Sequence, residues 1–590
     1  MGQLITELTK SLRKRGFLLI LFVIFVIGFI YRIIDLDSNL PGLYNDELYF
    51  LLSAYAQLHH INSLRVPGYT ISNFIFYSIN GYIPSIGLLH STPFSARFPV
   101  ALYGSIIIFP IYLLTMELLN NRYVAMMASF LWAISPSAVV TSRVGYGVEI
   151  FPLFLFLFFV LFWLKFLKYK RLRYFPLSLL FAIPIFFFTS LRIWGSIPIM
   201  GLVIYSILAP LRSKVIFKKK INTTLDFLVA FLLTITAIWV SLLYLPVFLS
   251  HFGYSNTLGG VQAHFLLVSK PFPQSLITLI TRLGYALSPL KMFWFGEFDK
   301  IELYYGSPVF VPFMPVFLMP FLYSSIFLFP LFFRKQSKMM RSYYLLICLL
   351  FLGILQPVLN ITNPAYNFEP SEGIFALPFL LILSSIAMNL FAKWIFTSFR
   401  KCKVSNEAMP TTFSTNILSA PDQHTKVVPA FLVIILIVFA GINVASFSND
   451  LFNSSNVQYM DNSNTSLNYM FYGWDHVTKF LIENHLYNET LYYTPGKEGS
   501  YNLTNNDNFN FWFFHQNFPL YWLYTYSEGK ITQIFPLFHG SIPSVSMTSA
   551  IILSQNDTYT HLLSSYGIDF SVLYTVYRAN GIPAIQVIQI

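Results

Sequence analysis

The chain has 590 residues, of which 55% are hydrophobic, 18% aromatic and only 11% charged, and its mean hydropathy is +0.60. Apolar runs of about 20 residues recur between residues 17 and 446, which excludes an ordinary soluble protein and predicts a polytopic α-helical membrane protein. The net charge of +12 does not indicate nucleic-acid binding, because Lys and Arg lie in short clusters between the apolar runs, a pattern that reports membrane orientation.

The basic clusters predict the topology. Lys10, Arg13, Lys14 and Arg15 precede the first apolar run, so the N-terminus is expected in the cytoplasm and the first loop outside. About eleven spans then place every basic cluster on the cytoplasmic side. We expect a break in the third span at Ser135-Pro136, because proline lacks the N–H that a helix needs. The predicted spans cover residues 17–34, 97–118, 123–141, 150–167, 174–190, 193–211, 225–248, 308–332, 343–359, 374–396 and 427–446.

Two predicted outer loops are too aromatic to be free linkers. In the first, residues 48–95, Leu48–Leu58 and Ile71–Ile79 have the pattern of short helices lying in the membrane interface. In the second, residues 249–307, Leu276–Leu287 has the same pattern. The loop at Thr141–Glu149 is predicted to be short.

The C-terminal segment differs in composition from the rest. Residues 1–446 are predicted to form the transmembrane domain, and residues 447–590 a soluble α/β domain outside the cell. A helical pattern at Trp474–Asn484 and a strand-like run at Thr490–Thr494 support the α/β assignment. Five glycosylation sequons fall in this segment, at Asn453, Asn464, Asn488, Asn502 and Asn556.

Two adjacent carboxylates, Asp46 and Glu47, follow the first span, and few other acids occur in the first 140 residues. A carboxylate pair just outside a bilayer can do acid/base chemistry at the membrane face. The alternative is that the pair only caps a loop or a helix start. No metal or other cofactor is expected, because the pair lacks the further oxygen ligands that a divalent ion gathers, although a divalent metal stays an alternative. Cys348 and Cys402 suggest neither a disulfide nor a zinc site.

Several arginines lie at the predicted outer ends of spans. Each is a candidate for binding an anion, and the alternative for each is a side chain that reaches up to the interface. Arg97 and Arg143 are the stronger candidates, since positive charge is not needed there to orient the helices. Arginine binds phosphate through its planar fork, so a lipid phosphate would suit this level of the membrane. The candidates for binding a donor phosphate are Arg97, Arg143 and Arg192, and those for positioning a substrate are Glu149 and Arg65.

The order of these motifs resembles a known family. Asp46-Glu47 is followed by an aromatic outer loop, by Ser95-Ala96-Arg97-Phe98-Pro99, and by Ser142-Arg143 with a downstream acid, Glu149. This order is similar to that of the family-39-like glycosyltransferases with the C-type membrane fold, which include protein O-mannosyltransferases and aminoarabinose transferases. The resemblance covers about residues 40–165 and continues beyond them as topology alone. The sequon-rich, aromatic composition resembles that of archaeal members.

The resemblance implies an inverting transfer of a sugar from a polyprenyl- or dolichyl-phosphate donor to an acceptor outside the cytoplasm. Asp46 would take the proton from the acceptor hydroxyl, and Glu47 would position the acceptor or tune Asp46. Arg97 would stabilise the departing lipid phosphate, and Arg143 with Glu149 would support that arrangement. The acceptor could be a protein, a lipid or a glycan, because the features that mark each kind of relative are missing.

Two other interpretations remain. Oligosaccharyltransferases share the membrane fold and carry a Trp-Asp core in an outer domain, and Trp474-Asp475 has that core, although Asp475 opens an ordinary helical pattern. A polytopic transporter or lipid flippase would show charges in the middle of spans and internal repeats. Neither feature is evident in the sequence, so we favour the glycosyltransferase.

Overall fold

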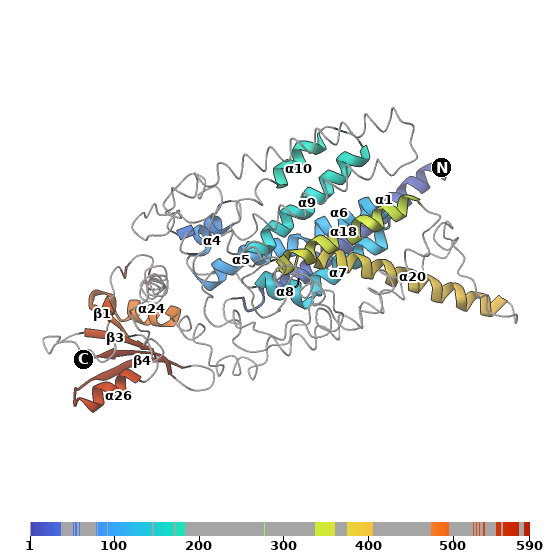
Figure 1. The fold of residues 1–590 in the computed structure, drawn as a ribbon. Coiled ribbons are helices and arrows are strands. Elements are labelled where there is room, and N and C mark those ends of the chain that lie inside the picture. The colour runs from blue at the N-terminus through green and yellow to red at the C-terminus, as the bar shows by residue number, and fades with distance from the viewer. Residues whose placement is uncertain are drawn as a thin grey trace. The chain divides into compact units, whose positions relative to one another are not determined.

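The structure, a computed structural model, describes residues 2–36, 81–90, 92–143, 147–169, 173–182, 337–359, 374–404, 474–494, 550–555, 558–577 and 583–590, with a few single residues and short pairs between them. The chain divides into two compact units. One comprises Met1–Ile34, Val100–Phe298 and Phe310–Phe447, and the other Asp35–Pro99, Asp299–Val309 and Ser448–Ile590. Figure 1 labels the helices and strands of both. The predicted domain boundary at residue 446 stays a prediction.

The described helices overlap the predicted spans, although those at the first and ninth spans begin earlier, and the one at the tenth ends later, than predicted. Helices lie where the first, second, third, fourth, ninth and tenth spans were predicted, and α10 covers the first half of the fifth. In chain order the helices before the C-terminal segment are α1 (Gly2–Ile33), α4 (Tyr82–Leu89), α5 (Pro93–Ile106), α6 (Ile108–Leu119), α7 (Arg122–Ile134), α8 (Pro136–Arg143), α9 (Gly147–Tyr169), α10 (Tyr174–Ala182), α18 (Ser337–Leu359) and α20 (Leu377–Val404). The predicted loop at Thr141–Glu149 is shorter than expected, because α8 continues to Arg143 and α9 begins at Gly147.

Within the described residues, three helical stretches are long and apolar enough to cross a membrane: Gly16–Ile33, Pro93–Leu119 and Ile150–Tyr169. On α1 the side chains of Leu18, Leu19 and Phe22 are more than half exposed, which is typical of residues that face lipid. The count of eleven spans is not tested, because the predicted spans at 193–211, 225–248, 308–332 and 427–446 lie outside the described residues. The predicted interfacial helices at 48–58, 71–79 and 276–287 fall almost entirely outside them as well.

Helix α7 lies at the centre of the described bundle and contacts α1, α6 and α20. It begins at Asn121, whose side-chain oxygen accepts hydrogen bonds from the backbone N–H groups of the second and third residues that follow. The indole Nε1 of Trp132 donates to the Gly104 carbonyl at 2.8 Å, and Ser129 Oγ donates to the Ile108 carbonyl at 3.1 Å. These bonds fix α7 against the junction of α5 and α6, where the described helix is interrupted.

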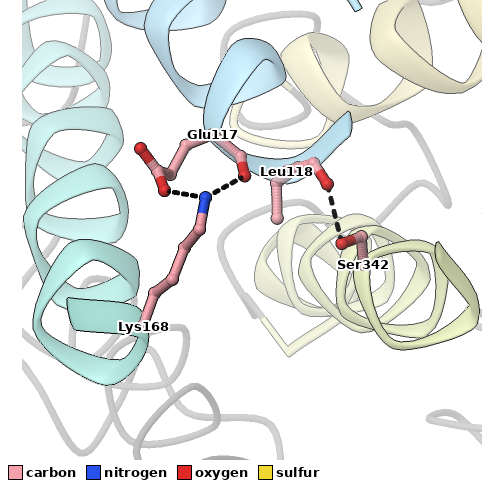
Figure 2. A network of polar contacts seen from close by, with 4 residues as sticks. All are labelled: Glu117, Leu118, Lys168 and Ser342. Atoms are coloured by element: carbon pink, nitrogen blue, oxygen red, sulfur yellow. Dashed lines mark hydrogen bonds and ion pairs between the residues drawn. The ribbon is translucent and has the colours of Figure 1, made fainter. Parts of the chain in front are cut away.

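The C-terminal end of α6 is held by two neighbouring helices (Figure 2). Lys168 Nζ of α9 donates to Glu117 Oε1 at 2.5 Å and lies 3.5 Å from the Glu117 carbonyl oxygen. Ser342 Oγ of α18 donates to the Leu118 carbonyl at 2.9 Å. The last carbonyls of a helix have no partner within it, so these side chains supply donors from outside. The Glu117 side chain is 12% exposed and that of Lys168 42%, so the carboxylate is shielded while the ammonium stays open to solvent.

The C-terminal segment forms an α/β sheet structure. Its described elements are α24 (Trp474–Glu483), β1 (Thr490–Thr494), β2 (Phe535–Pro536), β3 (Ala550–Gln555), α26 (Thr558–Ser565), β4 (Ser571–Tyr577) and β5 (Pro583–Gln589). The five-stranded sheet has the order β2-β1-β3-β5-β4, with β1 parallel to both neighbours and β5 antiparallel to β3 and β4. The predicted helix and strand at 474–484 and 490–494 are confirmed.

Helices cover both faces of this sheet. Tyr559 and Leu563 of α26 pack with Ile552 and Ile588, which pair with each other across β3 and β5. On β5 the neighbouring residue Val587 must point to the opposite face, and its register partner on β4 is Tyr574. The ring of Tyr574 stacks on Phe480 of α24 at 4.5 Å. The segment is therefore a three-layer α/β/α arrangement with its own core.

Candidate active site

The structure describes only some of the predicted site residues. Asp46, Glu47, Arg65 and Arg192 lie outside the described residues, so their predicted roles are not tested. Glu149 is placed in the first turn of α9, without a description of its side chain. The two stronger arginine candidates, Arg97 and Arg143, are both described, and both are almost completely buried.

The predicted break in the third span exposes backbone carbonyls inside the bundle. Ser135 is extended, with ψ 125°, and Pro136 begins the next helix. Since proline has no N–H, the Trp132 carbonyl loses the donor that a continuous helix would give it four residues later. The Ala133 carbonyl lies in the same last turn. Water is scarce at this depth, so both carbonyls need donors from the protein.

Arg32, in the last turn of α1, supplies those donors. Its Nη2 donates to the Trp132 carbonyl at 3.1 Å, and its Nη1 donates to the Ala133 carbonyl at 2.9 Å and to the Gly28 carbonyl at 3.0 Å. The side chain is completely buried. A guanidinium presents five N–H groups in a fixed fork, so one residue can serve several carbonyls at once. Arg32 therefore joins the end of α1 to the end of α7.

Arg143, the last residue of α8, makes the opposite connection. Its Nη1 donates to the Ile34 carbonyl at 2.6 Å and lies 3.3 and 3.4 Å from the carbonyl oxygens of Tyr31 and Arg32. These carbonyls belong to the last turn of α1 and the residue after it. A cation at a helix C-terminus also stabilises the negative end of the helix dipole. The two arginines thus form a reciprocal clamp: α1 caps α7, and α8 caps α1.

Arg97 holds the chain just beyond the first span. Its Nη1 donates to the Leu36 carbonyl at 3.0 Å. The start of α5 is fixed by a capping box, in which Ser95 N donates to Thr92 Oγ1 at 3.1 Å and Thr92 N donates to Ser95 Oγ at 3.0 Å. Ser85 Oγ of α4 donates to the Ser95 carbonyl at 2.7 Å. The first turn of α5 is therefore a firm base for Arg97.

A glycine makes room for the reciprocal clamp. A Cβ added to Gly104 would lie 3.2 Å from Arg32 Nε and would collide with the side chain of Ser142. Arg32 Nε has no hydrogen-bond partner among the described residues, so one buried N–H of this guanidinium is unsatisfied there. The positive charges of Arg32 and Arg143 also repel each other, and no described carboxylate forms an ion pair with Arg32. Packing and carbonyl bonds must outweigh this electrostatic cost.

Sequence reasoning missed Arg32. Arg97 and Arg143 were singled out because they lie at predicted outer ends of spans, and Arg32 lies at such an end too. A charged residue in the last turn of an apolar run was the signal available. Its partners could not be inferred, because they lie about a hundred residues away in sequence. For Arg97 and Arg143 the structure adds a backbone-anchoring role, and their predicted role in binding phosphate remains a prediction.

The described residues contain no group of three or more His, Cys, Asp and Glu side chains that could hold a metal ion. The acidic pair at 46–47 lies outside the described residues, so the expectation that no metal is needed is not tested. What the described geometry provides is a set of anchored carbonyls: those of Tyr31, Arg32 and Ile34 face Arg143, and that of Leu36 accepts from Arg97. The chain then reaches the acidic pair ten residues later.

No family model matches the chain, and no curated protein matches it in sequence. Among solved structures, it is similar to ArnT from Cupriavidus metallidurans bound to undecaprenyl phosphate, with a TM-score of 0.47, 11% identity and coverage of 97% of both chains. It is also similar to the oligosaccharyltransferase AglB from Archaeoglobus fulgidus in complex with an inhibitory peptide and a dolichol-phosphate, with a TM-score of 0.45, 12% identity and coverage of 93% of this chain and 71% of AglB. Similarity at this level assigns neither protein's activity to this chain.

The reciprocal clamp predicts that Arg32→Lys destabilises the protein. Lysine keeps the charge but cannot reach three carbonyls with one planar fork, so we expect a loss of about 2–4 kcal/mol in the free energy of unfolding. Thermal unfolding of the purified protein in detergent measures the effect. The matched control is Arg122→Lys on the exposed start of α7, which should change stability by less than about 0.5 kcal/mol. Equal melting temperatures for the two variants would contradict the clamp.

Gly104 predicts a second effect on stability. Gly104→Ala adds a methyl group where Ser142 and Arg32 lie, and overpacking of this kind costs about 1–3 kcal/mol. The control is Gly16→Ala in α1, where an added Cβ meets nothing within 4 Å. Alanine is the better helix former, so Gly16→Ala should be neutral or stabilising. The same unfolding measurement compares them, and a harmless Gly104→Ala would show that the helices separate easily here.

Proposed function

We propose that the chain is a membrane glycosyltransferase that moves a sugar from a polyprenyl- or dolichyl-phosphate donor to an acceptor on the outer side of the membrane. The observation that carries the proposal is the position of Asp46 and Glu47. They follow the first span. Arg143 donates to the Ile34 carbonyl at the end of that span, and Arg97 donates to the Leu36 carbonyl two residues later. An acid/base group needs a rigid approach to its substrate, and anchored backbone supports one.

The proposed reaction is a single displacement at the anomeric carbon. Asp46 accepts the proton of an acceptor hydroxyl while that oxygen attacks the anomeric carbon. The new carbon–oxygen bond forms on the face opposite the lipid phosphate, and the old bond breaks with its electron pair leaving on the phosphate oxygen. The configuration is therefore inverted. The departing phosphate carries the growing negative charge, which nearby arginines would stabilise. Arg97, Arg143 and Arg192 are proposed for that task, and Glu149 and Arg65 for positioning the substrate.

The proposal includes a location and partners. The chain is placed in the cell membrane with its N-terminus in the cytoplasm and residues 447–590 outside, where the sequons would be accessible. Its partners are the lipid-linked donor and a protein, lipid or glycan acceptor. No metal is included, since the acidic pair lacks the clustered oxygen ligands of a divalent site. A transporter or flippase would instead move the lipid without releasing sugar.

The central test is Asp46→Asn. Removing a general base lowers the rate by about a hundredfold to ten-thousandfold, while asparagine keeps the size of the side chain. Sugar release from a mixed pool of radiolabelled polyprenyl-phosphate sugars is measured with purified protein in lipid vesicles, with and without a chelator. Asp569→Asn, an exposed site in the C-terminal sheet structure, is the matched control and should keep full activity. Wild-type activity in Asp46→Asn, or no release by the wild type, would sink the proposal.

Arg97→Ala separates phosphate binding from backbone anchoring. If Arg97 contacts the donor phosphate, KM for the donor should rise about tenfold or more, since a charge-assisted hydrogen bond is lost. If Arg97 only anchors the Leu36 carbonyl, kcat should fall while the donor KM stays constant. Arg97→Lys keeps the charge and should recover part of the donor binding. A donor dependence that does not change in Arg97→Ala would remove the phosphate role.

A further inference from the structure

Aromatic side chains hold the end of α9 against the start of α10. The two helices pack through aromatic rings, with Phe158 and Phe162 of α9 at 5.0 and 5.6 Å from Phe181 of α10. Nearer the turn, Phe166 lies 5.5 Å from Phe175. Tyr174 N donates to the Arg171 carbonyl at 3.1 Å, which closes the turn. Arg171 and Arg173 therefore lie between two helix ends that pack against each other.

Two cations, Arg173 and Lys165, lie over the ring of Tyr174, the first residue of α10. Arg173 stacks over the Tyr174 ring at 5.1 Å, and its Nη2 donates to the Tyr174 hydroxyl at 3.3 Å. Lys165 Nζ lies 6.0 Å from the centre of the same ring. The charge of Arg171 also acts on this phenol. Contacts with an aromatic face restrict long side chains that would otherwise move freely in solvent.

These cations have an excess of positive charge that the described residues do not neutralise. The nearby Lys168 is paired with Glu117, as Figure 2 shows. Within the part of the chain that the structure describes, no carboxylate forms an ion pair with Lys165, Arg171 or Arg173. Arg171 and Arg173 are exposed, so an anion can reach them.

The depth of the cluster matches a lipid headgroup. The apolar stretch Ile150–Tyr169 is long enough to cross the hydrocarbon and ends where the turn begins. Tyrosines are common at this level of the membrane, where the ring lies among acyl chains and the hydroxyl reaches the headgroups. Tyr169 and Tyr174, 6.3 Å apart, flank the turn on its two helices.

We propose that Lys165, Arg171, Arg173 and the Tyr174 hydroxyl form a binding site for the phosphate of an anionic phospholipid headgroup. The two guanidinium groups would donate to the phosphate oxygens, and Lys165 would add a third charge. The Tyr174 hydroxyl accepts from Arg173 and has its own hydrogen available for a phosphate oxygen. The lipid tails would lie along the aromatic surface of α9 and α10. This site is separate from the proposed reaction and does not depend on it.

The test is a native mass-spectrometry titration of the full-length protein in detergent with phosphatidylglycerol or phosphatidylcholine. The site variant is Lys165→Gln/Arg171→Gln/Arg173→Gln. We expect the wild type to bind phosphatidylglycerol more tightly than phosphatidylcholine, and the site variant to bind phosphatidylglycerol at least about tenfold more weakly. Tyr174→Phe keeps the ring and all three cations, and should weaken binding about threefold through the lost hydroxyl. Melting temperatures in detergent without added lipid confirm that the variants are folded.

The charge-matched control is Lys10→Gln/Arg13→Gln/Lys14→Gln, which removes three positive charges at the N-terminus, on the same predicted side of the membrane. It should retain wild-type affinity for phosphatidylglycerol. If the control weakens binding as much as the site variant does, overall charge rather than this site recruits the lipid, and the proposal fails. Equal binding of both lipids by the wild type overturns it as well. Should the triple variant not fold, Arg171→Gln/Arg173→Gln, which changes exposed residues only, decides by the same comparison.

Discussion

The described bundle depends on the bonds that the buried Arg32 makes with the Trp132 and Ala133 carbonyls. A proline break inside a membrane protein leaves backbone acceptors where water does not reach, and each unmet acceptor costs free energy. Arg32 meets two of them with one side chain, at the cost of burying a charge. In the other direction, Arg143 of α8 donates to the Ile34 carbonyl at the end of α1. Separating α1 from α7 or from α8 would leave a buried guanidinium and backbone carbonyls without hydrogen-bond partners. The junction of α1, α7 and α8 is therefore a cooperative unit.

This constraint explains why the end of the first span is suited to support a site. A helix end in a membrane protein normally frays within its last turn, since its final carbonyls lack partners. Here the carbonyls of Tyr31, Arg32 and Ile34 face one guanidinium, and the Leu36 carbonyl accepts from another. Residues that carry out chemistry need fixed approach angles. The anchored segment ends ten residues before Asp46 in the sequence, so the proposed base follows a stretch whose carbonyls are held by arginines.

Positive charge serves three physical purposes in this chain. Buried arginines act as multidentate donors to backbone, where their value lies in hydrogen-bond geometry rather than in ion pairing. Lys168 shares its charge with the shielded carboxylate of Glu117 at the end of α6. Arg171 and Arg173 stay exposed beside aromatic rings, which leaves their charge available to an anion. The described basic residues named here therefore fall into structural, paired and accessible groups.

Hydropathy and local chemistry determined much of the architecture. Apolar runs located α1, α9, α18 and α20, proline chemistry located the break before α8, and a strand-like run located β1, because each signal depends on neighbours in sequence. The tertiary structure alone decided that Arg32 meets carbonyls about a hundred residues away, and that β1 lies between β2 and β3 with β5 running against them. Such pairings depend on which distant segments pack together, and a local sequence pattern contains no information about those distant contacts.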